Sequence, residues 1–254
     1  MSSMQKYKIV VAYDGTDYYG SQVQPCHPTV ASTIQNYFKD VFNKEIHLQN
    51  ASRTDAGVHA LGQAAAFMTD LVIEPEQLRN ALQNVLPDSI LIRSIESVPL
   101  DWNPRHHVQQ KIYYYHFFQE RPLPMLARFG WYYRHPVSRD ALYSALQLFV
   151  GTHDFRSFCT GAEYENTIKT IDAIDVEYFA RFKVYRIVVK GPGFLRYMIR
   201  RIVGACLEVA SRDTLTIDDL KKILDQKNPL HSLPTAPAKG LLLYKILYRD
   251  INEK

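Results

Sequence analysis

Several features that would indicate a membrane, secreted or disulfide-linked protein are missing from this sequence. No apolar run approaches the ~20 residues that a transmembrane helix needs. The three cysteines, Cys26, Cys159 and Cys206, are widely spaced and form no Cys-x-x-Cys pair. An odd number of separated cysteines predicts no disulfide framework and favours a reducing, cytoplasmic compartment. Residues 1–6 also lack the apolar core of a secretory signal.

Signatures of bound cofactors are missing as well. The sequence has no Gly-rich phosphate loop and no dinucleotide-binding fingerprint, and no set of Cys and His residues has the spacing of a zinc site. The adjacent pair His106-His107 would point to opposite faces of a strand, which is poor metal-binding geometry. We therefore expect no metal and no cofactor, which leaves a cofactor-free enzyme or a protein that is not an enzyme.

What the sequence does contain is aromatic and mildly basic. Its 254 residues carry a net charge of +4 and include 17 Tyr and 12 Phe, many of them beside Arg or Lys. Proteins that bind looped or single-stranded RNA use cations for phosphate and planar side chains for stacking. The alternative is that most of these rings belong to the core, and for most of them that is our expectation.

The pattern of apolar residues predicts the order βαββαβ in the first half and a similar order in the second. In the first half we expect strands at 7–13, 46–50, 62–69 and 89–98 and helices at 29–43 and from Pro75 onward. In the second half we expect strands at 107–118, 168–179, 182–190 and 241–248 and helices at 138–150, 195–211 and 217–224.

These elements predict an α+β fold of two split-βαβ (βαββαβ) units, whose antiparallel sheets join side by side and leave a catalytic cleft between them. A linker around residues 99–105 is the natural boundary. We expect an N-terminal α+β domain at 1–104 and a C-terminal α+β domain at 105–254.

The segment at residues 52–60, SRTDAGVHA, joins two expected strands and contains Asp55. Asp-x-Gly segments are often plain turns in which the carboxylate accepts backbone N–H groups, and that interpretation stays open. A carboxylate that faces a cation, however, stays ionised at neutral pH, as a nucleophile or general base requires. Arg53 is one nearby cation. Thr54 and His59 are expected to brace the loop through hydrogen bonds.

Two other regions could complete a site. Arg196, Arg200 and Arg201 lie on the expected helix at 195–211, away from its apolar face, with Arg196 and Arg200 on one flank and Arg201 on the other. A solvated basic face explains them equally well. If they are functional, one flank meets a carboxylate and the other binds phosphate, and the spacing does not decide which.

Tyrosines alternate along the expected strand at 107–118. Tyr113 and Tyr115 share one face, and Tyr114 lies on the other. One face is core, whereas a ring on the other could stack on a base or place its hydroxyl group in a site.

Taken together, several blocks identify a family. They are Arg53-Thr54-Asp55-Ala56-Gly57-Val58-His59 with YDGT at 13–16 and YYG at 18–20, then NPR at 103–105, KIYYY at 111–115, HDFRSF at 153–158, GFLRYMIRRIVG at 193–204 and TAPAKGL at 235–241. In these blocks and their order, across nearly the whole chain, the sequence resembles the TruA family of tRNA pseudouridine synthases.

The resemblance implies isomerisation of uridine to pseudouridine at positions 38–40 of the tRNA anticodon stem-loop, without metal or cofactor, by a homodimer. Asp55 matches the catalytic carboxylate, Tyr113 the tyrosine that stacks on the flipped base and helps to move a proton, and Arg200 the arginine that pairs with the catalytic Asp. Arg53 and Arg105 match basic positions that hold RNA. With Arg200 paired to the catalytic Asp, Arg201 on the other flank of the helix is left to bind the RNA phosphate. Whether the intermediate is a covalent sugar adduct or a glycal stays open.

The sequence departs from the family pattern at two positions. Ser21 stands where the family usually has Trp, which puts RNA contacts near this loop in question, and Pro104 stands where Ala is usual. Two alternatives to the anticodon-arm enzyme also stay open. One is a paralogous pseudouridine synthase that acts on another RNA, and the other is an RNA-binding module that has lost activity.

Overall fold

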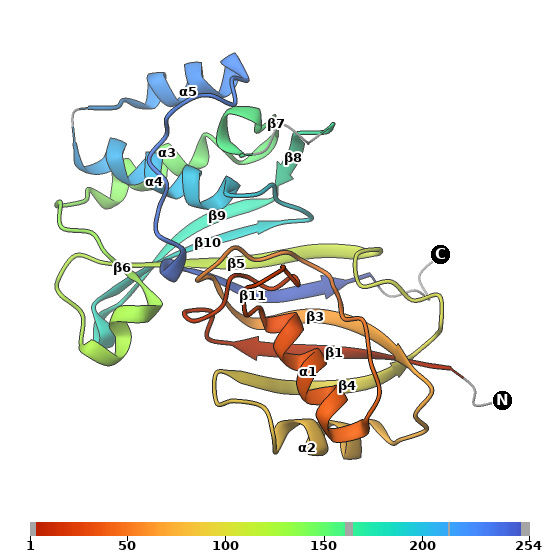
Figure 1. Cartoon of the computed structure of the whole chain (residues 1–254). Coiled ribbons are helices and arrows are strands. Elements are labelled where there is room, and N and C mark those ends of the chain that lie inside the picture. Colours follow the sequence, from red (N-terminus) through yellow and green to blue (C-terminus); the bar gives the residue numbers. More distant parts are fainter. Residues whose placement is uncertain (1–3, 161–164, 213, 250–254) are drawn as a thin grey trace. The chain divides into compact units, whose positions relative to one another are not determined.

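The computed structural model describes residues 4–160, 165–212 and 214–249, so residues 1–3 of the N-terminal segment discussed above lie outside it (Figure 1). The chain forms two compact units, one of Met1–Gln109 with Leu243–Lys254 and one of Gln110–Leu242. The expected boundary after residue 104 lies close to the observed one, but the last strand, which we expected in the C-terminal domain, belongs to the first unit. None of the described helices is long and apolar enough to cross a membrane.

The first unit has the expected βαββαβ order. Its elements are β1 (Gln5–Tyr13), α1 (Val30–Phe42), β2 (Gln49–Asn50), β3 (His59–Thr69), α2 (Pro75–Gln83) and β4 (Ile90–Val98). In the sheet, β1 pairs antiparallel with both β3 and β4, β2 pairs with β3, and β11 (Leu241–Tyr248) follows β3 in the strand order. The α+β class with a mainly antiparallel sheet is therefore confirmed.

Two strands of this unit, one on each side of the SRTDAGVHA segment, begin at residues other than the expected ones. The strand expected at 46–50 is only two residues long, and β3 begins at His59 rather than at residue 62. The reason for the early start is that Ala60 pairs with Tyr13 after an irregularity in the register of β1. The segment therefore ends inside a strand of the sheet, which fixes its second end.

The core of the first unit lies between the sheet and its two helices, which Figure 1 shows together on the sheet. Tyr7, Ile9, Phe38, Phe67 and Leu78 are completely or almost completely buried, and burial stabilises each side chain of this size by about 1.5–3 kcal/mol. The side chains come from β1, α1, β3 and α2, so the core joins both helices to β3, the strand in which the SRTDAGVHA segment ends.

In the second unit, β10 pairs antiparallel with both β5 and β9, and β6 pairs parallel with β5. A separate two-stranded sheet contains β7 and β8. The elements are β5 (Val108–Phe118), η1 (Pro124–Phe129), β6 (Trp131–Tyr132), α3 (Arg139–Gln147), β7 (Gly151–Asp154), η2 (Arg156–Phe158), β8 (Ile168–Ile171), β9 (Ala173–Phe179), η3 (Ala180–Phe182), β10 (Val184–Gly191), α4 (Met198–Ser211), α5 (Ile217–Gln226) and η4 (Ala238–Gly240).

Most of these elements agree with the expected ones, and the hairpin does turn at residues 180–182. The strand expected at 168–179 is divided into β8 and β9 at Asp172, and the short strands β6 and β7 were not expected. The helix expected from residue 195 begins only at Met198, because Tyr197 has a left-handed backbone conformation with φ of 62°. A residue with such a φ cannot continue a right-handed helix.

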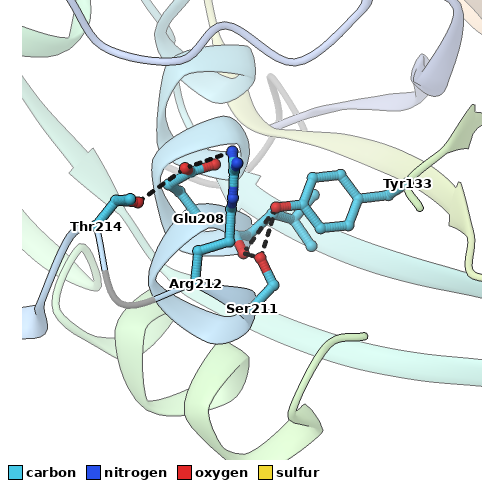
Figure 2. A network of polar contacts seen from close by, with 6 residues as sticks. Tyr133, Glu208, Ser211, Arg212 and Thr214 are labelled. Carbon is cyan, nitrogen blue, oxygen red and sulfur yellow. Dashed lines mark hydrogen bonds and ion pairs between the residues drawn. The ribbon is translucent and has the colours of Figure 1, made fainter. Parts of the chain in front are cut away.

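A polar network fixes the C-terminal end of α4 (Figure 2). The Tyr133 hydroxyl lies 2.6 Å from Ser211 Oγ, and Arg212 forms an ion pair with Glu208, which also accepts a hydrogen bond from Thr214. Burial raises the pKa of Tyr133. The helix that carries Arg200 near its beginning is therefore held at its far end by side chains.

Candidate active site

The segment at residues 51–58 forms a compact loop between β2 and β3, with the Asp55 side chain half-buried near its middle. Val58 N–H donates to the Asp55 carbonyl oxygen at 3.1 Å, and Gly57 N–H donates to Tyr18 O at 3.2 Å. Gly57 has a φ of 77°, in the left-handed region that favours glycine. The loop is thus a turn, as one interpretation of the sequence held, but it is tied to the chain on both sides of Asp55.

Thr54, the residue before Asp55, is held by hydrogen bonds to Ser21 and Tyr13. Its N–H donates to Ser21 Oγ at 2.9 Å, and its carbonyl oxygen accepts from Ser21 N–H at 3.2 Å. Its hydroxyl lies 2.8 Å from the Tyr13 hydroxyl in a buried contact. Thr54 therefore braces the loop through hydrogen bonds, as we expected.

His59 connects the other end of the loop to the YDGT block. Its Nδ1 accepts a hydrogen bond from Gly15 N–H at 3.0 Å and lies 3.1 Å from an Asp14 carboxylate oxygen, and the ring is only 3% exposed. A side chain at Gly15 would overlap the Val58 carbonyl group, so this close approach requires glycine. His59 thus has the bracing role that we expected.

Arg53 and Arg105 both belong to the first unit. Arg53 is exposed on the Asp55 loop itself. Arg105 Nε donates to Asn50 O, at the end of β2, at 3.1 Å, and its backbone N–H donates to the Asn103 side chain at 2.9 Å. The structure therefore brings Arg105 to the strand from which the Asp55 loop starts, although the two are far apart in sequence.

Tyr113 lies on β5 in the second unit and is 5% exposed. Tyr113 and Tyr115 are both buried and Tyr114 is more exposed, which confirms the expected alternation. The Tyr113 ring meets Phe194 edge to face, with centroids 5.3 Å apart. Tyr115 donates to Pro237 O at 2.9 Å, and burial raises its pKa.

Arg200 lies in the first turn of α4. Its Nε donates to Ala236 O at 2.7 Å, and its own carbonyl oxygen accepts from Ala236 N–H at 3.0 Å. Its guanidinium group lies over the Tyr197 ring, 4.7 Å from the centroid, and that of Arg196 lies 5.3 Å from the same ring. Our placement of Arg196 on the helix is wrong, because the helix begins after Tyr197, but both cations lie against the same ring.

Arg201 points to a different part of the second unit. Its Nη1 donates to the carbonyl oxygens of Cys159 and Ser157, at 2.9 and 3.3 Å. These contacts hold η2 and the residue that follows it against α4. They agree with the expectation that Arg201 lies on the other flank from Arg200, and its contact with RNA stays a prediction.

The family model described as tRNA pseudouridine synthase matches residues 9–107 and 145–249. The chain belongs to the tRNA pseudouridine synthase family. It is an isomerase of the TruA type, as the sequence blocks predicted.

Curated relatives of this synthase match over their whole length. "tRNA pseudouridine synthase A" of Brevibacillus brevis is 37% identical over 248 residues, and that of Thermotoga neapolitana is 34% identical over 247. The protein of the same name from Thermodesulfovibrio yellowstonii is 32% identical over 255 residues. Each match covers 96% of this chain and 100% of the relative.

The sequence reasoning missed the residues that hold this synthase's loop in place. Ser21 drew attention only as a departure from the family pattern, yet it is 1% exposed and bonded to Thr54. Gln63 is 2% exposed and its amide bonds to Ser52. A polar residue inside an expected strand or loop gives no signal of burial by itself, so only the structure could find these two.

The first unit offers a carboxylate on its Asp55 loop, and the second unit offers a buried phenol at Tyr113 and the guanidinium groups of α4. Within residues 4–160, 165–212 and 214–249, no three His, Cys, Asp or Glu side chains cluster so as to hold a metal ion.

Proposed function

We propose that this tRNA pseudouridine synthase isomerises uridine at positions 38–40 of the anticodon stem-loop, with Asp55 as the catalytic carboxylate. The observation that carries the proposal is the Asp55 loop. Its neighbours are fixed by buried hydrogen bonds while the carboxylate itself stays half-exposed. A carboxylate that only capped a turn would not need such a frame, whereas one that must meet a reacting atom does.

In the proposed reaction, Asp55 attacks the ribose C1′ and the bond from C1′ to N1 of uracil breaks. The detached uracil turns and its C5 bonds to C1′, which displaces the carboxylate. The C5 proton is lost and N1 gains one, so the product is an isomer of the substrate. In the alternative through a glycal, Asp55 removes a proton from C2′ while the bond from C1′ to N1 breaks and a double bond forms between C1′ and C2′. The proton returns to C2′ when C5 bonds to C1′, and both routes need an ionised carboxylate.

Tyr113 is proposed to stack on the flipped base and to help move the C5 proton. The base must leave its helix to be reached, so a planar partner offsets part of the lost stacking. The edge-to-face packing of Tyr113 against Phe194 supports this role, because it holds the ring in one orientation.

Arg200 is proposed as the cation that pairs with the Asp55 carboxylate, and Arg53, Arg105 and Arg201 as contacts to the RNA. Cations in the first turn of a helix are disfavoured by the helix dipole, by about 0.3–1 kcal/mol. Arg200 and Arg201 both lie in the first turn of α4. That placement supports a role beyond folding, because folding alone would favour acidic residues there.

We further propose that the enzyme acts as a cytoplasmic homodimer without a cofactor. The cysteine pattern supports the compartment, since three free and separated thiols suit a reducing environment. The resemblance described above supports the dimer.

The experiment that tests this proposal maps pseudouridine in all RNAs of a strain that lacks the gene, with and without a plasmid copy. We expect loss at tRNA positions 38–40 alone and recovery with the plasmid copy. Loss in another RNA would identify a paralogous synthase instead. An unchanged map would contradict the proposed enzyme and favour a module that only binds RNA.

A further inference from the structure

The hydrogen bonds of Thr54 reveal how the first unit holds Asp55. Its N–H, its carbonyl oxygen and its hydroxyl are all bonded, and all three bonds go to just two residues, Ser21 and Tyr13. The Thr54 carbonyl group belongs to the peptide bond that leads into Asp55. Fixing that peptide plane limits where the Asp55 side chain can point.

Ser21 can serve as an anchor because it is fixed itself. It is 1% exposed, and its carbonyl oxygen accepts from Asn50 Nδ2 at 2.9 Å and from Ala31 N–H at 3.2 Å. Gly20 allows the approach. Its φ is 92°, and a Cβ there would lie 2.6 Å from the Thr54 carbonyl oxygen. Ser21 therefore connects the start of α1, the end of β2 and the Asp55 loop.

A second pair of hydrogen bonds fixes the start of the loop. The Gln63 amide Nε2 donates to Ser52 O at 2.6 Å, and Ser52 N–H donates to Gln63 Oε1 at 3.3 Å. Tyr13 and Gln63 lie on the paired strands β1 and β3 and are 5% and 2% exposed. The loop thus packs on a buried polar cluster, whose members Tyr13 and Gln63 belong to the paired strands β1 and β3.

We infer that Ser21 and Tyr13 are positioning residues for the isomerisation, which act through Thr54 to aim the Asp55 carboxylate. The inference rests on the proposed role of Asp55. Neither residue touches the reacting atoms. They exclude loop conformations in which the carboxylate is displaced, and a displacement of about 1 Å is enough to slow a positioned reaction by about 100-fold.

The Tyr13 hydroxyl holds its proton throughout the range in which the enzyme would be assayed. Burial raises its pKa to about 12, with a smaller opposing effect of the Thr54 hydrogen bond. Tyr13 therefore works as a fixed hydrogen-bonding group and does not relay protons. Its loss should lower the rate by one factor at every pH and leave the shape of the pH–rate profile unchanged.

The test is a double-mutant cycle on purified full-length protein with Tyr13→Phe, Thr54→Val and the double variant. Rates are measured in single turnover with saturating enzyme on an anticodon stem-loop RNA, and affinity is measured for the same RNA. We expect each single variant to lose about 10–100-fold in rate, with affinity within about twofold. The double variant should be no slower than the worse single variant, since both remove one contact.

Tyr7→Phe is the matched control, because it removes another buried phenol hydroxyl from the same strand. Tyr7 bonds to Ile73 O and Gln5 and lies at the opposite end of β1, about 20 Å from Tyr13. It should lose stability and keep the wild-type rate. Thr54→Ser, which keeps all three polar groups, should restore most of the rate.

Ser21→Ala removes the hydroxyl of the other residue that bonds to Thr54. It replaces Tyr13→Phe in the test if that variant does not fold. The inference is overturned if Tyr13→Phe or Ser21→Ala reacts as fast as Tyr7→Phe, or if the losses in the cycle multiply. Activity of an Asp55→Ala enzyme would instead refute the proposed nucleophile. Loss of activity in Asp55→Ala with full activity in Tyr13→Phe would refute the positioning role alone.

Discussion

The two regions proposed to carry the chemistry are fixed in different ways. The Asp55 loop of the first unit is held by buried side chains, with Ser21 and Tyr13 bonded to Thr54. The first turn of α4 in the second unit is held by backbone groups, with Arg200 bonded twice to Ala236. Loss of one side-chain hydroxyl can therefore make the loop more mobile. The contacts of Arg200 with Ala236 are lost only if the backbone around Ala236 moves.

This difference agrees with what each region has to present. A carboxylate on a short side chain takes its position from the backbone next to it, so the loop itself must be rigid. Arginine has a long and flexible side chain, so a fixed backbone does not by itself fix its guanidinium group. Contacts to the planar group itself must orient it. The Nε bond to Ala236 and the contact with the Tyr197 ring supply that orientation.

The largest effect in the second unit is expected from Arg200→Lys. Lysine keeps the positive charge but loses the planar fork and the Nε bond to Ala236 O. We expect the single-turnover rate to fall by about 100-fold. Arg212→Lys, an exposed change at the other end of α4, is the control and should leave the rate unchanged. An Arg200→Lys enzyme with the wild-type rate would show that charge alone suffices.

Gly20→Ala should break the frame of the Asp55 loop through the backbone. Its φ of 92° is strained for alanine, and the new Cβ would lie 2.6 Å from the Thr54 carbonyl oxygen. We expect a loss of about 2 kcal/mol or more in the free energy of unfolding, measured in urea, together with a slower reaction. Gly193→Ala, where no atom lies within 4 Å of the new Cβ, should change stability little.

Gly204→Ala tests whether the segment at residues 234–236 packs closely against α4. The test is whether the change raises or lowers the free energy of unfolding. Alanine in place of glycine inside a helix usually stabilises it by about 1 kcal/mol. Here a Cβ would overlap the Pro234 carbonyl group and push the segment that bonds to Arg200 away from α4. We expect lower stability in urea and a slower reaction. A stabilised and fully active variant would contradict this packing.

The smallest effect concerns Tyr13 at high pH. Its folded-state pKa of about 12 lies above the ordinary value of 10.0, so its contribution to stability is complete below about pH 10 and is lost as the pH rises toward 12. Wild type should lose on the order of 2 kcal/mol more than Tyr13→Phe over that interval. Urea unfolding at pH 9 and pH 11.5 measures the difference, and equal losses would show that Tyr13 is not buried as described.

The sequence predicted those parts of the molecule that follow from local periodicity. The βαββαβ order of the first unit, the alternation of Tyr113 and Tyr115 and the turn at Asp55 are all of this kind. The sequence did not predict where α4 begins, because that depends on one backbone angle. The left-handed conformation of Tyr197 places the start of α4 after Arg196. Helical periodicity contains no information on such a residue.

Long-range placement was also beyond the sequence. The last strand follows in the chain after α5 but belongs to the first unit, beside β3, and Gly62 is needed there because a Cβ would lie 2.5 Å from Tyr244 O. Ser21 is the most instructive miss. Its hydroxyl matters because of Thr54, a residue 33 positions away, and no local pattern connects the two.

The central claim is that Asp55 performs the chemistry and that the rest of its loop holds it in place. The most direct test compares wild type and Asp55→Ala in single turnover on an anticodon stem-loop RNA, with affinity for that RNA measured in parallel. The account predicts that the variant forms no detectable pseudouridine while it binds the RNA within about twofold of wild type. Pseudouridine formed by the variant at a rate near that of wild type would contradict the account.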